Sequence, residues 1–387
     1  MTREKDPWTL IAAATIGNGL GLLPTASSAF LVGGLMDDRG FSEVQAGLLT
    51  TVELMAIAGT ALAVAPFMAG LSVVRVALCG ALLSGLAQLA SAPLDSLWWL
   101  ATARLAAGIG AGLVLAATTA AVATARNPDR LYSYAWIGIL GISAALYPGL
   151  AMTIDATSVA GGYALLGTLS LLWLPSLRWL AHAPRAAVTT DAKEQSLPRG
   201  ELGLLMALIG MLGLGSAPLF PFVERIAVSI GMEAGQIGAA VSIGQLGTLG
   251  GALFAGALGA RWGRRVPVAL GLAALGAACL GLGFVSSGVG YTGLMVLFFM
   301  AYAFAQVFLF ATVAILDPSG RVGPAALGWF MLTVALGPAL GGVLVTAGSY
   351  TALGWFALAV YGLGVLLALL FGRPLNRLGA SSAQRAP

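Results

Sequence analysis

The chain is dominated by apolar segments that are each long enough to cross a lipid bilayer as one helix. Crossing takes about 20 consecutive, mostly apolar residues, and the 387-residue sequence contains a series of such segments separated by short polar breaks. Only 9% of its residues are charged and 59% are hydrophobic, whereas soluble domains carry about 25% charged residues. The sequence therefore predicts an all-α integral membrane protein surrounded by the lipid bilayer. The segments are too long and too evenly apolar for the alternating strands of an outer-membrane barrel.

We expect twelve transmembrane helices, arranged as two groups of six. The predicted spans are 8–35, 43–69, 73–92, 97–125, 131–154, 159–180, 201–223, 234–260, 266–285, 291–316, 323–346 and 351–371. The longest break between spans is rich in charged residues, alanine and threonine. This pattern predicts an N-terminal six-helix bundle over 1–180, a cytoplasmic linker over 181–200 and a C-terminal six-helix bundle over 201–373. The remaining residues, 374–387, are expected to form a disordered cytoplasmic tail.

The lysines and arginines predict the orientation, because cytoplasmic loops of membrane proteins carry an excess of both. With the N-terminus placed in the cytoplasm, every basic residue falls on the cytoplasmic side except Arg39, Arg104 and Arg225. We therefore expect both termini in the cytoplasm and a multi-pass protein of the inner membrane of a bacterial cell. The net charge of +4 follows from this topology, so no nucleic-acid partner is expected.

The two halves of the chain repeat each other. The stretch from Gly40 to Gly47, GFSEVQAG, resembles the stretch from Gly231 to Gly238, GMEAGQIG, which begins 191 residues later. Pro148 and Pro338 are related by nearly the same offset, 190 residues. Two pseudo-symmetric halves related by a parallel repeat predict a substrate site near the middle of the membrane, between the bundles.

Three motifs resemble those of the major facilitator superfamily. The stretch 256–265, GALGARWGRR, is similar to the G-x-L-a-D-R-x-G-R-R loop of that family. The stretch 100–112 resembles its fourth-span pattern R-x-x-x-G-x-G. The stretches 146–149 and 336–342 resemble its fifth-span element G-P-x-x-G-G, in the form that is similar to that of antiporters. The resemblance implies the fold of this family, two six-helix bundles, and secondary transport by alternating access. The positions of the family's cytoplasmic loop motif correspond in this sequence to Gly256, Arg261, Gly263, Arg264 and Arg265. Ala260 replaces the aspartate of the motif, so the cytoplasmic charge latch is expected to be weaker or to use other acids.

Arg104 lies well inside the fourth apolar segment. An arginine at the middle of a membrane helix costs about 2.5–3.5 kcal/mol on insertion scales, so it needs a partner or a water-filled cavity. Gly108 and Gly112 follow on the same helix face, where small residues let another backbone approach closely. Arg104 has a functional role, either binding an anionic group or holding the carbonyls of a neighbouring span in a proton-coupled cavity, or it is a purely structural tether to the backbone of the first span. These two interpretations are given equal weight.

Glu53 is the matching acidic residue in the second span. It lies ten residues into the segment, about 15 Å along a helix and therefore near the middle of the bilayer. A medium of low dielectric constant favours the protonated form of a carboxyl group, which lets such a group take up and release a proton. We predict that Glu53 carries a coupling proton together with Arg104. The alternative is a carboxylate that Arg104 or a neighbouring helix neutralises permanently.

The remaining polar residues of the spans are candidates for a substrate cavity and a gate. Polar side chains also join helices in membranes, but together these predict a mostly apolar pocket for a small molecule. The candidate cavity residues are Asn18, Thr25, Thr50, Tyr147, Ser242, Gln245, Tyr302 and Gln306. Glu224 and Arg225, near the outer end of the seventh span, form either a gate or a solvated pair at the interface. The solvated pair is slightly favoured.

The chain offers little for catalysis. It has one histidine and two cysteines, and it contains no nucleotide-binding motif of the Walker type. We therefore expect no enzyme activity, no metal and no cofactor, with the proton as the coupling ion and a monomeric chain. The expected function is proton-coupled transport of a small molecule, with efflux of an amphiphilic compound by antiport favoured. The alternatives are proton-coupled uptake of a small organic anion and a membrane binding or sensor protein that does not transport.

Overall fold

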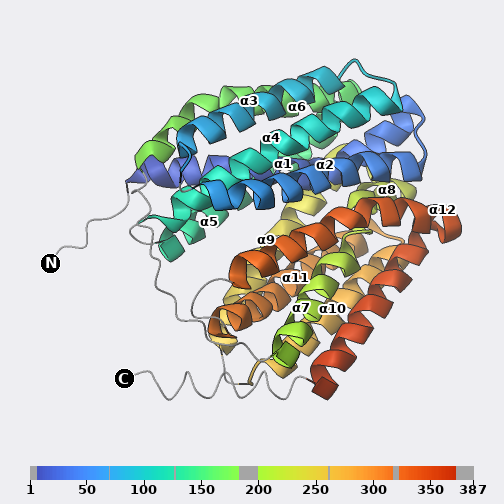
Figure 1. Ribbon diagram of the computed structural model, residues 1–387. Helices are drawn as coiled ribbons and strands as arrows, with labels where there is room; N and C mark the ends of the chain where they lie inside the picture. The colour runs from blue at the N-terminus through green and yellow to red at the C-terminus, as the bar shows by residue number, and fades with distance from the viewer. Residues whose placement is uncertain are drawn as a thin grey trace. The chain divides into compact units, whose positions relative to one another are not determined.

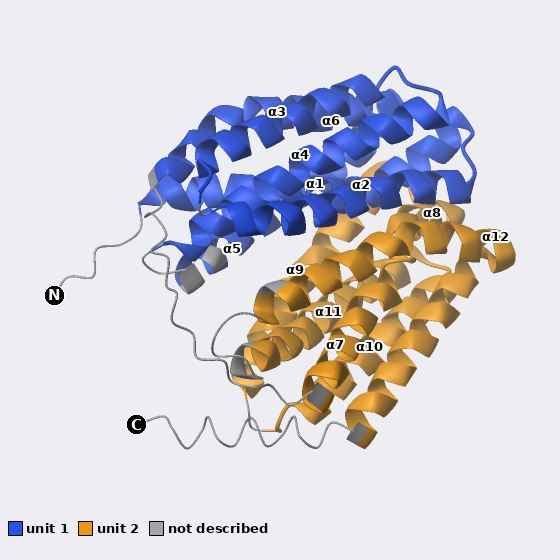
Figure 2. Cartoon of the chain, in the orientation of Figure 1, with its two compact units in different colours: residues 1–190 blue, residues 191–387 orange. Residues whose placement is uncertain are grey.

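The computed structural model describes residues 7–68, 70–125, 128–182, 199–259, 262–316 and 322–371, and these are almost entirely helical (Figure 1). The chain divides into two compact units, residues 1–190 and 191–387 (Figure 2). The boundary between them falls inside the predicted linker 181–200. Residues 183–198 of that linker and the predicted tail 374–387 lie outside the described residues.

The first unit is a bundle of six helices. They are α1 (Trp8–Arg39), α2 (Glu43–Val64) with the 3-10 turn η1 (Ala65–Phe67), α3 (Val73–Ser91), α4 (Leu97–Ala123), α5 (Pro128–Ala156) and α6 (Val159–Leu172) with the 3-10 segment η2 (Leu174–His182). Gly40, in the left-handed conformation with φ of 64°, ends α1, and this conformation favours glycine. Ser42 and Gln45 then form a reciprocal capping box that starts α2. The short connection between the first two spans is therefore encoded locally.

The second unit contains the other six spans. Its helices are α7 (Arg199–Ser216), the 3-10 turn η3 (Phe220–Phe222), α8 (Val223–Ser229), α9 (Ala234–Leu258), α10 (Arg265–Phe284), α11 (Gly288–Leu316) and α12 (Val322–Phe371). The backbone of α12 leaves the helical conformation at Gly348 and Ser349, which divides it into two spans. Eleven helical segments of the described chain are long and apolar enough to cross a membrane, and the longest, Ala325–Leu370, contains this break. The prediction of twelve spans is confirmed.

The seventh span differs from its prediction. We expected one helix over 201–223, but α7 ends at Ser216 and the chain continues through η3 into the short helix α8. Pro218 and Pro221 lie in this break. Proline has no N–H to donate and its ring crowds the preceding turn, so a regular helix does not continue through both.

The two bundles are built on the same plan. The starts of α1 and α7, of α2 and α9, and of α4 and α11 are each 191 residues apart. Side-chain contacts follow the same offset: a Cβ placed on Gly80 would meet Leu113, and a Cβ placed on Gly271 would meet Phe304. Positions on α2, α3, α4 and α6 can therefore be compared with the second unit by adding 191, whereas Pro148 of α5 corresponds to Pro338 with an offset of 190.

Candidate functional site

Glu53 and Arg104 form an ion pair in the interior of the first bundle. Nη1 of Arg104 lies 3.1 Å from Oε1 of Glu53. Arg104 is 2% exposed and Glu53 3% exposed, so neither side chain points out toward lipid. The structure thus gives the intramembrane arginine the acidic partner that its position requires.

Gln88 of α3 joins both members of the pair. Its amide nitrogen donates a hydrogen bond to Oε1 of Glu53 at 3.3 Å, and its amide oxygen accepts one from Nη1 of Arg104 at 2.8 Å. Gln88 is fully buried. A single amide therefore ties α3 to the charges of both α2 and α4.

Two further side chains complete what we call the Arg104 cluster: Glu53, Gln88, Ser91, Arg104 and Tyr163. Nη2 of Arg104 donates to the hydroxyl of Ser91 and, at 3.4 Å, to the carbonyl of Ala87. The ring of Tyr163, on α6, lies 4.4 Å from the guanidinium carbon, a geometry that favours a cation–π interaction. Among the described residues, the contacts of Arg104 lie on α2, α3 and α6, and the structure gives it no bond to the backbone of the first span.

A glycine face on α4 allows this arrangement. A Cβ placed on Gly108 would lie 2.3 Å from the carbonyl oxygen of Glu53, and a Cβ on Gly112 would lie 2.7 Å from that of Ile57. No real side chain fits at such distances, so α2 and α4 approach each other only because these two positions lack one. The close approach brings Glu53 within reach of Arg104.

The last two residues of α1 hold the helices that carry the cluster. Arg39 donates to the carbonyls of Ser91, Ala92 and Leu94 at the end of α3, where the helix dipole favours a positive charge. The carboxylate of Asp38 accepts a hydrogen bond from the backbone N–H of Val159 at the start of α6, where a negative charge is favoured. We call Asp38 and Arg39 the α1 clamp.

The α1 clamp also touches the cluster. The guanidinium of Arg39 lies 5.6 Å from the ring centroid of Tyr163, the same ring that Arg104 contacts. The side chain of Arg39 is 5% exposed, and its Nε lies 3.6 Å from the exposed carboxylate of Asp95. A series of contacts therefore leads from the exposed Asp95 through Arg39 and Tyr163 to the buried pair of Arg104 and Glu53.

The second bundle has no such cluster at the corresponding positions. Gly244, Cys279, Met295 and Gly354 stand where Glu53, Gln88, Arg104 and Tyr163 stand in the first bundle. They pack as two pairs: a Cβ on Gly244 would meet Met295, and a Cβ on Gly354 would meet the carbonyl oxygen of Cys279. The second bundle therefore packs the corresponding helices against one another without a polar cluster.

The predicted cavity residues of the first bundle are mostly bonded within their own helices. Asn18 donates to the carbonyl of Ala14, and Thr50 donates to that of Ala46. Tyr147 is buried, with its ring 6.0 Å from that of Phe30, and Thr25 is half-buried. Their role in a substrate cavity stays a prediction.

The predicted cavity residues of the second bundle lie on α9 and α11. Ser242 donates to the carbonyl of Gly238, and Gln245 is half-buried on the same helix. Tyr302 stacks against Phe298 and is followed one turn later by Gln306. These side chains belong to the second unit, and a role in binding substrate stays a prediction for them too.

The predicted gate residues, Glu224 and Arg225, are half-buried in the first turn of α8. They follow the proline-containing break that ends α7. Neither belongs to the Arg104 cluster, which lies in the other unit. Their function as a gate stays a prediction.

The loop before α10 shows the local geometry of the predicted cytoplasmic motif. Gly263 has a φ of 66°, a left-handed conformation that favours glycine. Arg264 donates to the hydroxyl of Thr312 on α11 at 3.0 Å, and Arg265 donates to the carbonyl of Leu369 near the end of α12. Gly256 lies within α9, while Arg261 lies outside the described residues. The two described arginines thus join the start of α10 to two other helices of the bundle.

Sequence reasoning found the ion pair but missed its other partners. Gln88 and Ser91 are three residues apart and therefore share one face of the third span, whereas Tyr163 lies in a different span. Gln88 was the available signal, because a buried amide in a membrane span needs a hydrogen-bonding partner on another helix. Arg39 was assigned to the outer side but not to the cluster.

Two bundles of six membrane-crossing helices, related by an internal repeat, define the protein as a multi-pass membrane protein of the twelve-helix type. The family model of the Major Facilitator Superfamily matches residues 8–331, and the chain belongs to this family. Proteins of this family are generally carriers that move molecules across membranes.

Solved structures support the same fold. A bacterial homologue of the human lysosomal transporter Spinster, in an inward-facing and unoccupied conformation, aligns with a TM-score of 0.72 and 12% identity, covering 98% of this chain and 99% of that chain. A D-xylose–proton symporter gives 0.75 and 16%, covering 95% and 97%. The nucleoside transporter NupG, as a point mutant, gives 0.68 and 14%, covering 94% and 99%. No curated protein matches the sequence.

Proposed function

We propose that this protein is a proton-coupled secondary transporter that exports a small amphiphilic compound in exchange for protons. Glu53 carries the coupling proton, and Arg104 controls the charge state of Glu53. The single observation that supports this most is the buried Glu53–Arg104 pair, bridged by Gln88, in a bundle whose repeat does without it.

The energetics of buried ion pairs favour a role other than stability. Removing two charges from water costs several kcal/mol per ion, and apolar residues of similar volume often replace such a pair without loss of stability. The second bundle shows such a replacement, with Gly244 and Met295 in contact. The Glu53–Arg104 pair carries this desolvation cost and is present in the first bundle but not at the corresponding positions of the second. It is therefore a candidate for the proton-dependent step.

Protonation of Glu53 would change the forces between three helices. With Glu53 ionised, the carboxylate accepts from both Gln88 and Arg104 and holds α2 against α3 and α4. With Glu53 neutral, the guanidinium keeps its bonds to Gln88, Ala87 and Ser91 but loses its counter-charge. The contact between α2 and α4 is then weaker, which is the kind of local change that alternating access can use.

The apolar character of the spans supports an amphiphilic substrate. Few polar side chains are available to recognise a hydrophilic substrate, and an apolar pocket with few polar points suits an amphiphile. Pro148 in α5 and Pro338 in α12 lie inside helices at the elements whose sequences resemble those of antiporters.

The rival hypothesis is proton-coupled uptake of a small organic anion held by Arg104. The geometry disfavours it, because Nη1 and Nη2 of Arg104 already bind protein groups and only Nε has no described hydrogen-bond partner. An anion at this guanidinium would have to displace Glu53. A D-xylose–proton symporter has a similar fold, which supports proton symport on this architecture, so the rival needs an experimental test.

Purified protein in liposomes separates these possibilities. With a pH gradient imposed, accumulation of ethidium, an amphiphilic cation, should require the gradient and stop when a protonophore is added. Movement of gluconate together with protons would favour the uptake hypothesis. A thermal shift caused by either compound without flux of that compound would indicate a binding or sensor protein.

A further inference from the structure

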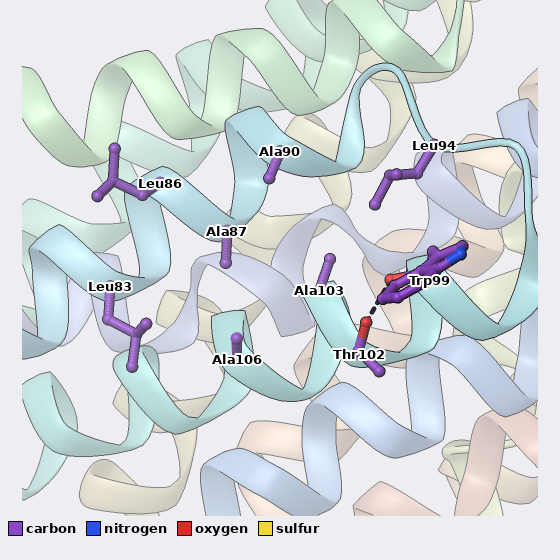
Figure 3. Close-up of a pocket in the computed structure, with 9 residues that line it drawn as sticks. All are labelled: Leu83, Leu86, Ala87, Ala90, Leu94, Trp99, Thr102, Ala103 and Ala106. Carbon is purple, nitrogen blue, oxygen red and sulfur yellow. Dashed lines mark hydrogen bonds between the residues drawn. The ribbon is translucent and has the colours of Figure 1, made fainter.

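A groove runs between α3 and α4 on the surface of the first bundle (Figure 3). Its volume is about 370 Å³, and its surface is almost entirely apolar. The residues that line it are Leu83, Leu86, Ala87, Ala90, Leu94, Trp99, Thr102, Ala103 and Ala106. Only two of these side chains carry a polar group, the indole N–H of Trp99 and the hydroxyl of Thr102. Thr102 donates its hydroxyl hydrogen to the carbonyl of Trp99 on its own helix, so the groove offers little to a polar ligand.

Alanines create the groove. Figure 3 shows Ala87 and Ala90 of α3 facing Ala103 and Ala106 of α4, with the longer Leu83 and Leu86 beside them. In the second bundle the positions of Ala103 and Ala106 hold Leu294 and Leu297. A Cβ placed on Gly281, which corresponds to Ala90, would lie 2.7 Å from Leu294 Cδ2. Leucine thus fills, in one half of the repeat, the space that alanine leaves open in the other.

The groove faces the medium around the spans rather than the interior of the bundle. Leu86 is 51% exposed and Trp99 67% exposed, although both lie on membrane-crossing helices. The neighbouring Trp98 is 80% exposed at the start of α4, and tryptophan is typical of the membrane–water interface. The groove therefore begins at headgroup level and continues into the hydrocarbon layer.

We propose that this groove binds one acyl chain of a membrane phospholipid, from the leaflet that the α3–α4 connection faces. The apolar lining, the exposure to the hydrocarbon layer and the interfacial tryptophans all match this occupant. The proposal is independent of proton coupling, because lipid binding can be measured without transport.

A bound chain would lie directly behind the Arg104 cluster. Ala87 lines the groove, and its carbonyl accepts a hydrogen bond from Arg104. Ala103 lines the groove and immediately precedes Arg104. The acyl chain would pack over the contact between α3 and α4 and hold Gln88 and Ser91 in place around the guanidinium.

The test uses the full-length protein in liposomes that contain phosphatidylcholine with a photoreactive diazirine in one acyl chain. After illumination, mass spectrometry of peptides should locate most of the label between residues 83 and 106. The double variant A103L/A106L introduces the leucines of the second bundle and fills the groove. It should reduce this labelling about tenfold, the factor that corresponds to losing the burial of two methylene groups. Ala90→Leu fills the groove from the exposed face of α3 and should reduce labelling even if the double variant folds poorly.

The matched control is Gly293→Leu, which adds a leucine on an exposed face of α11 where a Cβ meets nothing within 4 Å. It should leave the labelling of 83–106 unchanged. Equal labelling of all exposed helix faces, or unchanged labelling in both groove variants, would overturn the proposal. Displacement of the label by ethidium would also overturn it, because the groove would then belong to the transported compound.

Discussion

Met295 packs against Gly244 in the second bundle, where a Cβ placed on the glycine would lie 2.9 Å from Met295 Cβ. Arg104 and Glu53 stand at the corresponding positions of the first bundle and form a buried ion pair. The same contact between two helices is therefore made once by charged and once by uncharged residues. The contact between these two helices therefore does not require charged residues, and the ion pair is an additional feature of the first bundle.

Replacing Glu53 by glutamine tests the proton-carrying role. Glutamine keeps the size of the side chain and its ability to bond Gln88, but it cannot take up or release a proton near neutral pH. We expect Glu53→Gln to abolish accumulation of ethidium driven by a pH gradient in liposomes, while exchange of ethidium across the membrane continues.

Glu43→Gln is the matched control, because Glu43 lies in the first turn of the same helix. It should transport as the unmodified protein does. Gradient-driven accumulation that survives in Glu53→Gln would show that the coupling proton is carried elsewhere.

A double-mutant cycle measures the energy of the pair. Arg104→Met introduces the residue of the second bundle and leaves the carboxylate of Glu53 buried without a counter-charge. Breaking one side of a buried pair costs about 3–5 kcal/mol of folding free energy. Adding Glu53→Gln removes the unpaired charge, so we expect it to restore about 2 kcal/mol, within the range of coupling between residues in contact.

Unfolding of the purified protein in detergent, followed by circular dichroism, gives the four free energies. The variants Glu43→Gln and Arg75→Met, at positions with no described contact to each other, should be additive. Additive effects of Glu53→Gln and Arg104→Met would mean that the two side chains do not interact in the membrane protein.

The sequence was enough to predict the architecture because each span is long, apolar and flanked by local signals. The expected starts at Glu43, Leu97 and Ala234 coincide with the observed helix starts. Capping boxes start α2 and α9, and Gly259 ends α9; such signals act within a few residues of one another. The break in the seventh span was missed, although Pro218 and Pro221 are visible in the sequence, because hydropathy alone continues through it.

The Arg104 cluster was predictable only in part. Glu53 and Arg104 stood out because charge in a membrane span is rare and needs a partner. Gln88 and Tyr163 did not stand out, because a helix that is apolar on all sides has no polar face that would reveal its rotation. Which turn of α3 faces α4 depends on small residues such as Gly80, where a Cβ would lie 2.6 Å from the carbonyl of Gly110, and this is a property of the packed bundle.

The α1 clamp should control how firmly α3 is held. Arg39→Lys keeps the charge, but an ammonium cannot reach the carbonyls of Ser91, Ala92 and Leu94 with the planar fork of arginine. Hydrogen bonds to charged groups contribute about 1.5–3 kcal/mol each, so the end of α3 should open more often. Hydrogen–deuterium exchange of residues 87–92 should accelerate by about tenfold or more.

Arg75→Lys, at an exposed position in the first turn of α3, should leave exchange of this segment unchanged. Equal protection in Arg39→Lys would mean that the carbonyls at the end of α3 are held by other groups and that the α1 clamp does not act on the cluster.

The glycine face of α4 makes the distance between α2 and α4 sensitive to one methyl group. A Cβ on Gly108 would lie 2.3 Å from the carbonyl oxygen of Glu53, so Gly108→Ala must push the two helices apart. Overpacking of this kind costs about 1–3 kcal/mol, and it moves Glu53 away from Arg104.

Gly59→Ala on α2 is the matched control: its Cβ meets nothing within 4 Å, and alanine in a helix is more stable than glycine by about 0.5–1 kcal/mol. Thermal unfolding should therefore shift in opposite directions for the two variants, and only Gly108→Ala should reduce gradient-driven transport of ethidium. If both variants unfolded alike and transported normally, close contact between α2 and α4 would not be what positions the ion pair.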